Sequence, residues 1–254
     1  MTWAQEKKEL GFQILLFLYQ HGMIKTFYRD KPSGWTLISG LYSPLYIQLR
    51  PILSYPQGFR LICKAMGRLL QEEAPSVNKA VGIAMAGIPI VAGMSILAHI
   101  PAAFTRKLEG IKSLDTLQKS IFSYGEHSLL EGEIGPGDRL ALIDDLVTRF
   151  DSKLIALEQL RHEISKRNVP DVICSTIAVV IDREQGGEKA AETIGVKLLR
   201  LIPFKTAGIA MLRNYMHPLE WDVIQRYLED PAGFQDPQVQ QQIEQMCPRS
   251  QIQA

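Results

Sequence analysis

The sequence predicts an α/β fold with a mainly parallel central sheet flanked by helices, preceded by a small N-terminal hood of helix and short strands. Hydrophobic residues make up 46% and charged residues 22% of the 254 residues, which is typical of a globular chain and excludes a disordered one. Short apolar runs rich in Val and Ile alternate with segments of helical spacing, and this alternation is typical of parallel sheets. The runs span residues 80–85, 102–106, 139–147 and 173–182.

The N-terminal region has a different pattern. Apolar residues recur at helical spacing from Glu6 to His21, and Gly22 ends the run. Two short apolar runs then lie among turn residues between positions 30 and 50, which predicts small strands. We therefore divide the chain into an N-terminal helix and hood strands (1–75), an α/β core (76–230) and a polar, Gln-rich C-terminal tail with a short helix (231–254).

One segment needs a separate argument, because Val81 to Phe104 contains no Asp, Glu, Lys or Arg. Its length would allow it to cross a bilayer. However, glycines and prolines interrupt it, and a strand, a turn and a buried helix account for the same residues. We expect the second arrangement, and hence no membrane association.

Charge and cysteine content limit the function classes. The chain has 28 basic and 27 acidic residues, a net charge of +1, so nothing favours nucleic acid as a partner. An anionic ligand must therefore be held by a local site. The three cysteines are widely spaced and odd in number, which favours a reducing compartment without disulfides or a zinc site. Since the N-terminus also lacks a signal-peptide pattern, we expect a cytoplasmic protein.

The most informative segment is the strand predicted at 140–143, which is followed by Asp144 and Asp145 and then by a helix that begins near Ser152. The carboxyl ends of parallel strands line the ligand crevice of such folds. Two adjacent carboxylates there can accept hydrogen bonds from a diol, and the following helix N-terminus can hold a phosphate. A pair that is simply solvated at a strand end explains the same residues equally well.

Five blocks of sequence, in order, resemble the orotate phosphoribosyltransferases, a family of type I phosphoribosyltransferases. The resemblance covers about residues 10 to 230. The last block, which contains the sequence DREQGG, is close to specific for this family. The blocks are 39–50, 80–97, Arg106-Lys107 with 124–139, 140–148 and 179–187.

For the phosphorylated sugar, the resemblance implies the following roles. Asp144 and Asp145 bind the ribose hydroxyls of phosphoribosyl pyrophosphate (PRPP), and Thr148 and Ser152 belong to the loop that holds its 5′-phosphate. The turn at Ala86-Gly87 lies near the pyrophosphate. Mg²⁺ bridges the pyrophosphate when PRPP is bound, with no direct protein ligand.

For the base and the partner subunit, the resemblance implies four further roles. Arg183 contacts orotate, and the segment around Tyr46 lies over the base. Arg106 and Lys107 begin a flexible loop that reaches into the site of a second subunit, so the family works as a homodimer. From the residues alone, Arg183 could instead pin a turn by pairing with a neighbouring glutamate.

Three departures from the family pattern concern the binding of phosphate groups. Phe150 stands where the phosphate loop has glycine, and Asp151 adds a negative charge beside it. Glycine is used there because backbone N–H groups must approach the phosphate closely. Ile38 and Phe122 each replace a lysine, and neither can donate a hydrogen bond.

These departures lead us to expect a degenerate PRPP site with impaired or absent catalysis, in a homodimer that acts by binding a ligand or a protein partner. The alternative is an active orotate phosphoribosyltransferase of pyrimidine biosynthesis, which converts orotate and PRPP to orotidine 5′-phosphate and pyrophosphate. A third possibility is a structural or regulatory dimer whose tail, residues 231–254, contacts another protein.

Overall fold

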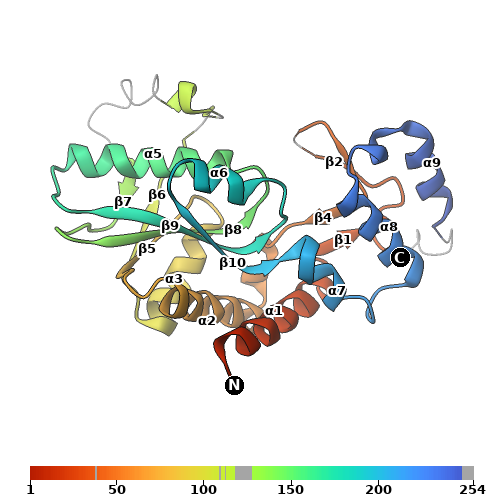
Figure 1. Ribbon diagram of the computed structural model, residues 1–254, viewed down its shortest axis with the longest axis horizontal. Helices are drawn as coiled ribbons and strands as arrows, with labels where there is room; N and C mark the ends of the chain where they lie inside the picture. Colours follow the sequence, from red (N-terminus) through yellow and green to blue (C-terminus); the bar gives the residue numbers. More distant parts are fainter. Residues whose placement is uncertain (38, 109, 112, 118–127, 248–254) are drawn as a thin grey trace. The chain divides into compact units, whose positions relative to one another are not determined.

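A mainly parallel sheet forms the centre of the larger part of the molecule (Figure 1). The computed structural model describes residues 1–37, 39–108, 110–111, 113–117 and 128–247. Within these residues the sheet has six strands in the order β10-β9-β8-β5-β6-β7, and only the β6–β7 pair is antiparallel. This confirms the predicted fold class. The strands are β5 (Lys79–Gly82), β6 (Ala102–Thr105), β7 (Leu130–Glu131), β8 (Arg139–Val147), β9 (Ile173–Asp182) and β10 (Lys197–Pro203).

Helices cover both faces of this sheet. The helices α2 (Pro56–Glu73) and α3 (Gly87–Ala98) lie on one face, and α5 (Asp151–Lys166) and α6 (Gly187–Thr193) lie on the other (Figure 1). Strands that are covered on both sides read as continuous apolar runs. Accordingly, residues 140–143 of β8 and 177–181 of β9 are at most 1% exposed.

The uncharged segment from Val81 to Phe104 folds as the sequence predicts, with β5, a turn, α3 and β6 in succession. The turn is tight because α3 begins directly against β8. A Cβ atom on Gly87 would lie 2.1 Å from the carbonyl oxygen of Ile143, so a side chain has no room there. None of the helices within the described residues combines the length and apolar character that a membrane crossing requires.

The chain divides into two compact units. The first contains the sheet and comprises residues 1–10 and 55–204, and the second comprises residues 11–54 and 205–254. The helix α1 (Trp3–Gln20) therefore begins in the first unit and continues in the second. In the second unit β1 (Ile24–Thr26) pairs with β4 (Leu45–Ile47), and β2 (Trp35–Thr36) pairs with β3 (Tyr42–Ser43). The remaining elements are η1 (Arg50–Ser54), η2 (Phe204–Gly208), α7 (Ile209–Met211), α8 (Pro218–Glu229), η3 (Gly233–Gln235) and α9 (Pro237–Gln245).

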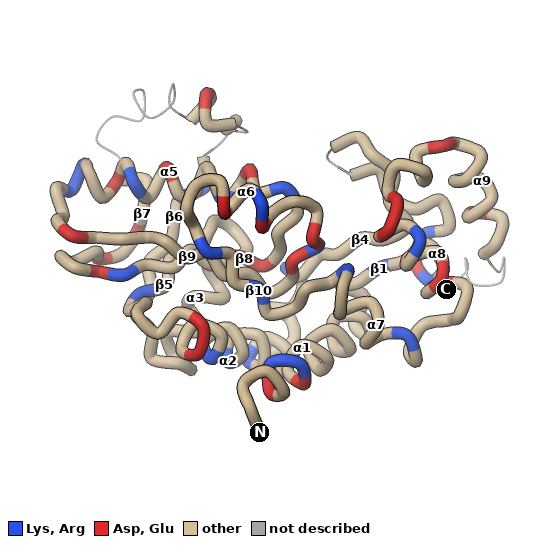
Figure 2. The backbone as a smooth tube through the Cα atoms, viewed as in Figure 1, with Lys and Arg blue, Asp and Glu red and all other residues tan. Residues whose placement is uncertain are grey.

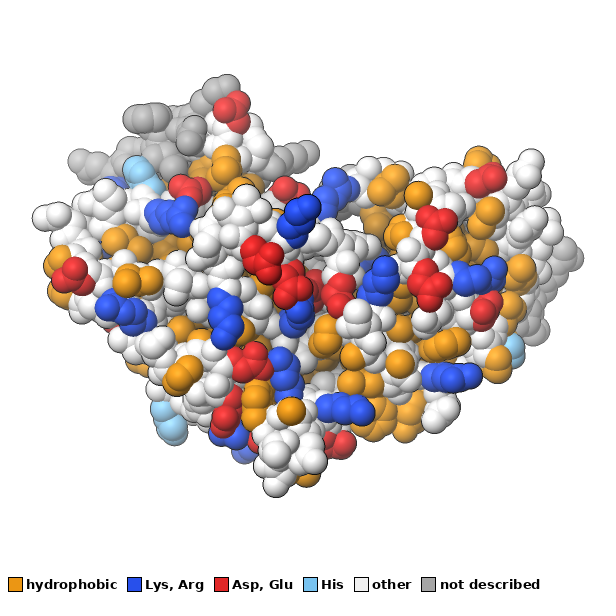
Figure 3. Space-filling view, viewed as in Figure 1, with side chains coloured by type: hydrophobic (Ala, Val, Ile, Leu, Met, Phe, Trp, Pro, Cys, Tyr) orange, Lys and Arg blue, Asp and Glu red, His pale blue; other side chains and the backbone are white. Residues whose placement is uncertain are grey.

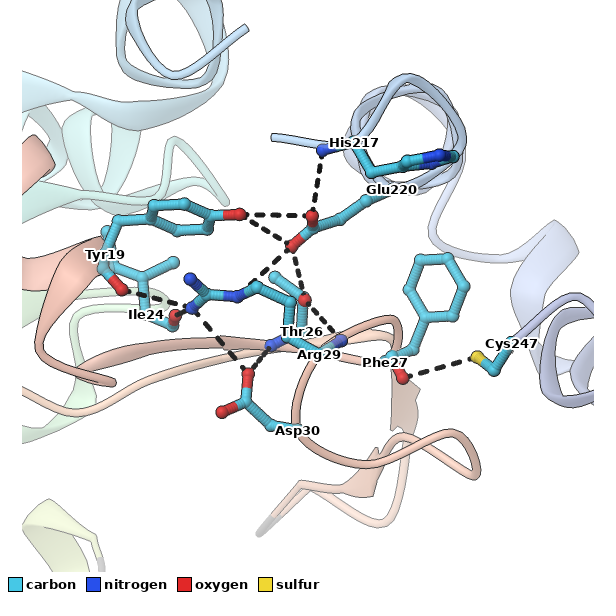
Figure 4. Close-up of polar contacts among 9 residues, drawn as sticks. All are labelled: Tyr19, Ile24, Thr26, Phe27, Arg29, Asp30, His217, Glu220 and Cys247. Atoms are coloured by element: carbon cyan, nitrogen blue, oxygen red, sulfur yellow. Dashed lines mark hydrogen bonds and ion pairs between the residues drawn. The ribbon is translucent and has the colours of Figure 1, made fainter. Parts of the chain in front are cut away.

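A buried carboxylate joins the N-terminal and C-terminal parts of the second unit (Figure 4). Glu220 of α8 is 1% exposed and accepts hydrogen bonds from the hydroxyls of Tyr19 and Thr26 and from the N–H of His217. The Arg29 Nε atom lies 3.7 Å from the same carboxylate. We call these five residues the Glu220 cluster.

The C-terminal segment packs against the same unit. The Tyr42 N–H donates to Gln235 Oε1 at 2.8 Å, and the Cys247 thiol donates to the Phe27 carbonyl at 3.4 Å. Phe234 is 8% and Ile243 is 3% exposed. Two apolar side chains thus anchor a segment that is otherwise Gln-rich, and the expected short helix is present as α9.

Basic and acidic positions are interspersed along the backbone of each unit (Figure 2). On the face that Figure 3 shows, both signs also occur in small mixed groups. An anionic ligand on that face would depend on individually placed groups, and those predicted from the sequence lie at the strand ends.

Candidate active site

Most of the predicted site residues meet at the carboxyl ends of four neighbouring strands in the first unit. The order β9-β8-β5-β6 places these ends side by side along one edge of the sheet. In open α/β sheets this edge is where ligands bind. The residues brought together are Arg183 after β9, Asp144, Asp145 and Thr148 at the end of β8, Ala86 and Gly87 after β5, and Arg106 and Lys107 after β6.

The two aspartates of β8 have different surroundings. Asp144 is 7% exposed, whereas Asp145 is half-buried. Asp144 Oδ1 accepts the N–H of Asp145 at 2.9 Å, and its Oδ2 lies 2.8 Å from the ammonium of Lys153. Burial and the charge of Asp144 raise the pKa of Asp145 to about 7, while the charge of Lys153 acts in the opposite direction. A carboxyl with such a pKa changes charge near neutral pH.

The loop from Thr148 to Ser152 connects β8 to α5 and carries Phe150 at its centre. Phe150 has φ 109° and ψ −10°, a conformation that favours glycine. Its carbonyl accepts the N–H groups of Lys153 and Leu154, so it begins the helix. The ring is not spread over the loop, because Phe150 is 5% exposed and belongs to the buried cluster between the sheet and α5. The loop therefore keeps a backbone that is typical of glycine, while its ring fills the core.

The charges in this loop lie at the surface. Asp151, Arg149 and Ser152 are all exposed, in contrast to the buried ring between them. The expected charge of Asp151 beside the loop is thus present, with the opposite charge of Arg149 two residues before it in the chain.

Arg183 lies beside the end of β8, because its N–H donates to the Val147 carbonyl at 3.0 Å. Its side chain is 4% exposed, yet Nε and Nη2 have no hydrogen-bond partner in the described part of the chain. A buried donor without a partner is costly and needs an explanation such as a ligand. The alternative role, to pin the turn, belongs to another residue. Arg200 pairs with Asp182 at 3.1 Å and with Glu188 at 2.7 Å.

The turn after β5 is held against its neighbours on both sides. The Ile83 N–H donates to the Ile143 carbonyl at 2.9 Å, and the Ala84 N–H donates to Thr105 Oγ1 at 3.1 Å. These bonds fix the turn that contains Ala86-Gly87 between the ends of β8 and β6. The position agrees with a role beside the ligand of the Asp pair.

After β6 the two basic residues differ in their engagement. The Arg106 Nε atom lies 3.7 Å from Glu131 Oε1, and its carbonyl accepts from Gln159 of α5 at 2.9 Å. Lys107 is exposed. Beyond it, a small apolar cluster of Leu108, Leu117 and Leu129 packs with Ile155 of α5.

Four predicted features are not among the described residues of the first unit. Tyr46 belongs to the second unit, where its ring stacks on Trp35 with centroids 5.9 Å apart. Ile38 and Phe122 lie outside the described residues, together with Tyr124-Gly125 of the expected loop.

The sequence reasoning missed Lys153 and Arg200. Both are basic residues whose partners lie in another element, and only tertiary structure brings them together. For Lys153 a signal exists, since helical side chains point toward the N-terminus of their helix, and here the Asp pair precedes that terminus. Among the described residues, no group of three or more His, Cys, Asp or Glu could hold a metal ion.

Comparisons with known proteins place this site in a family, although no family model matches the chain. The chain is 30% identical over 184 residues to the orotate phosphoribosyltransferase of Pyrococcus abyssi, which covers 71% of this chain and 91% of that protein. It is 32% identical over 176 residues to the uridine 5′-monophosphate synthase of Caenorhabditis elegans, 69% of this chain but only 32% of that protein. Among solved structures, a UMP synthase from Leishmania donovani has a TM-score of 0.67 at 22% identity, covering 86% of this chain and 42% of that one.

The mainly parallel six-stranded sheet with helices on both faces has the fold of a type I phosphoribosyltransferase. The similarity to the archaeal relative extends over nearly the whole of that protein at 30% identity. The chain belongs to the orotate phosphoribosyltransferase family.

Proposed function

We propose that this chain is an active phosphoribosyltransferase that converts orotate and PRPP to orotidine 5′-phosphate and pyrophosphate. One observation supports this above the others. Arg183, which is 4% exposed, has two unpartnered nitrogen atoms next to the end of the strand that carries the Asp pair. Nothing in the described part of the chain hydrogen-bonds these atoms, and a planar anionic base can accept from a guanidinium in two places.

The residues at the strand ends have different roles in such a transfer. Ionised Asp145, with Asp144 beside it, accepts hydrogen bonds from the ribose hydroxyls and so orients the sugar. The loop before α5 and the N-terminus of that helix receive the 5′-phosphate. Arg183 holds the base so that its ring nitrogen forms the bond to the anomeric carbon while the bond from that carbon to the pyrophosphate oxygen breaks. Cationic groups stabilise the departing pyrophosphate.

Impaired catalysis is the competing proposal, and it draws on three departures from the family pattern. The Phe150 ring is buried in the core, which leaves the outer side of the loop to the exposed residues around it. The other two departures, Ile38 and Phe122, lie outside the described residues. The active enzyme therefore has the stronger support, and the assay below decides between the two proposals.

Three further features form part of the proposal. Magnesium would be bound together with PRPP rather than by protein side chains, and it would supply positive charge to the leaving group. The protein acts as a homodimer in which Arg106 and Lys107 of one subunit serve the site of the other. The three free thiols suit a cytoplasmic, reducing compartment. An assay with and without EDTA and light scattering in solution test the first two.

The decisive experiment measures orotate consumption by purified protein with PRPP and Mg²⁺. We expect turnover by the wild type and a loss of about 10³-fold in the double variant Asp144→Asn with Asp145→Asn. The control is Asp222→Asn, which changes an exposed aspartate of α8. A folded wild-type protein without turnover would establish impaired catalysis instead. Calorimetry with PRPP would then separate a binding protein from one that has lost the ligand.

A further inference from the structure

Lys153 is a buried ammonium directly behind the ribose-binding strand end. It is the third residue of α5 and is 4% exposed. Its Nζ atom lies 2.8 Å from Asp144 Oδ2 and donates to the Leu146 carbonyl and, at 3.3 Å, to Ser152 Oγ. An ammonium group has three donors, and these three acceptors satisfy all of them. Lys153 is therefore a built part of the site rather than a surface lysine.

This contact changes what the Asp pair can do. Both oxygens of Asp144 are engaged, one by the N–H of Asp145 and the other by Lys153. Asp145 remains half-buried beside it. Two adjacent carboxylates repel each other when they are removed from water, and a cation next to one of them reduces this repulsion.

We propose that Lys153 is a positioning residue for the ribose site, whose ammonium holds Asp144 in place and offsets one of the two negative charges next to Asp145. Asp145 can then become ionised and accept the hydrogen bond from a ribose hydroxyl. The inference rests on the proposed function for the identity of the ligand. The charge relation between Lys153 and Asp145 exists in the ligand-free protein and can be measured there.

The charged groups around Asp145 come from several elements. Asp144 precedes it in β8, and Lys153 comes from α5. At the end of the neighbouring strand β9, Asp182 is paired with Arg200, and Arg183 and Glu184 follow it in the chain. The turn after β5 and the helix α3 contain no ionisable side chain. Lys153 is accordingly the cation that lowers the pKa of Asp145.

The sign of the pH dependence follows from the pKa of Asp145, which is raised to about 7. The folded protein holds this proton more tightly than the unfolded chain does. Its contribution to stability is therefore present at low pH and is lost as the pH rises from about 4 to about 7. A ribose hydroxyl donates to the ionised form of Asp145, so the affinity for PRPP should rise as the pH increases through about 7.

The test is a carboxyl ¹³C NMR titration of Asp145 in the ligand-free protein. In Lys153→Met the midpoint should rise by about one pH unit, because the lowering charge is gone. Lys153→Gln keeps a hydrogen-bond donor without charge and should show the same rise, and it is the variant to use if the methionine variant fails to fold. Lys153→Arg should restore the wild-type midpoint. Lys166→Met, at the exposed end of the same helix, is the control and should leave it unchanged.

Calorimetry of PRPP binding between pH 5.5 and 8.5 gives a second readout. The midpoint of the affinity should move upward in parallel with the titration of Asp145. A purely structural lysine would lower the affinity equally at every pH. An Asp145 midpoint that stays at the wild-type value in both the Gln and the Met variants overturns the inference. If the wild type binds no PRPP, the proposed function fails, whereas the ligand-free titration still decides the role of Lys153.

Discussion

Each unit contains an arginine that is removed from water at least in part, and the two arginines differ in how completely their donors are hydrogen-bonded. In the second unit, Glu220 accepts from the Tyr19 and Thr26 hydroxyls and from a backbone N–H, and Arg29 donates to two carbonyls and lies 3.7 Å above the Tyr19 ring (Figure 4). In the first unit, Arg183 is 4% exposed and leaves Nε and Nη2 without a hydrogen-bond partner in the described part of the chain, whereas Arg29 leaves Nε, which faces Glu220 Oε1 at 3.7 Å. Arg29 thus belongs to an internal network of hydrogen bonds and ion pairs, whereas Arg183 has donors that remain available to a ligand.

The two units also differ in how burial affects the ionisation of a side chain, as Tyr19 and Asp145 show. Burial and the charge of Glu220 raise the pKa of Tyr19, which keeps this hydroxyl a neutral donor at any physiological pH. Burial and the charge of Asp144 raise the pKa of Asp145 only to about 7. Tyr19 therefore holds one protonation state, whereas Asp145 changes its charge near neutral pH.

The largest effect on stability should come from breaking the Glu220 cluster. Glu220→Leu leaves the half-buried Arg29 opposite an apolar side chain and removes the buried acceptor of two hydroxyls. We expect a loss of about 3–5 kcal/mol in the free energy of unfolding, measured by urea titration. Glu229→Leu, which changes an exposed glutamate of the same helix, is the matched control. A loss below about 1 kcal/mol would mean that the Glu220 cluster contributes little to the stability of the fold.

Replacing Arg183 should have the opposite pattern of effects: activity should fall while stability is kept. Arg183→Met removes a buried charge that lacks hydrogen-bond partners for two of its nitrogens, so the free energy of unfolding should stay the same or increase. The kcat/KM for orotate should fall by about 10²-fold or more, which corresponds to about 2.7 kcal/mol.

Arg200→Met is the contrasting variant for this prediction. It leaves the fully buried carboxylate of Asp182 without its cation and should therefore reduce stability first. If Arg183→Met destabilised the protein as much as Arg200→Met does while activity remained, Arg183 would be a structural residue and the proposed orotate contact would be wrong.

The same contrast explains how much the sequence could predict. The sheet, the position of the Asp pair and the turn at Ala86-Gly87 follow from local patterns, because an apolar strand and the residue after it are neighbours in the chain. The Glu220 cluster joins residues that are 194 and 201 positions apart, and no local pattern signals such a contact. Arg200 was missed for the same reason, whereas Lys153 lies close in the chain to its partners and could have been found from the direction of helical side chains.

Phe150 shows what the sequence could not predict within the candidate site. The sequence places a bulky residue in the loop after β8, at a position where the resemblance implies a glycine. It does not specify which way the ring points, since that depends on whether the helix and the sheet leave a space for it. The structure places the ring in that space and retains the positive φ.

The smallest effect, and the sharpest test of the boundary between core and site, concerns Phe150 itself. Replacing it with glycine relieves a conformation that costs a non-glycine residue about 1–2 kcal/mol, but it also removes a buried ring. We expect a net loss of about 2 kcal/mol in the free energy of unfolding, and an affinity for PRPP within about threefold of the wild type.

Phe150→Ala should be less stable than Phe150→Gly by about 1 kcal/mol, because alanine loses the ring and keeps the strained φ. Phe150 is the N-cap of α5, a position that also favours glycine over alanine, and urea titrations of both variants measure the difference directly. A tenfold gain in PRPP affinity in Phe150→Gly would contradict the packing argument. It would mean that the ring obstructs the phosphate loop, and that this part of the first unit is closed to its ligand in the wild-type protein.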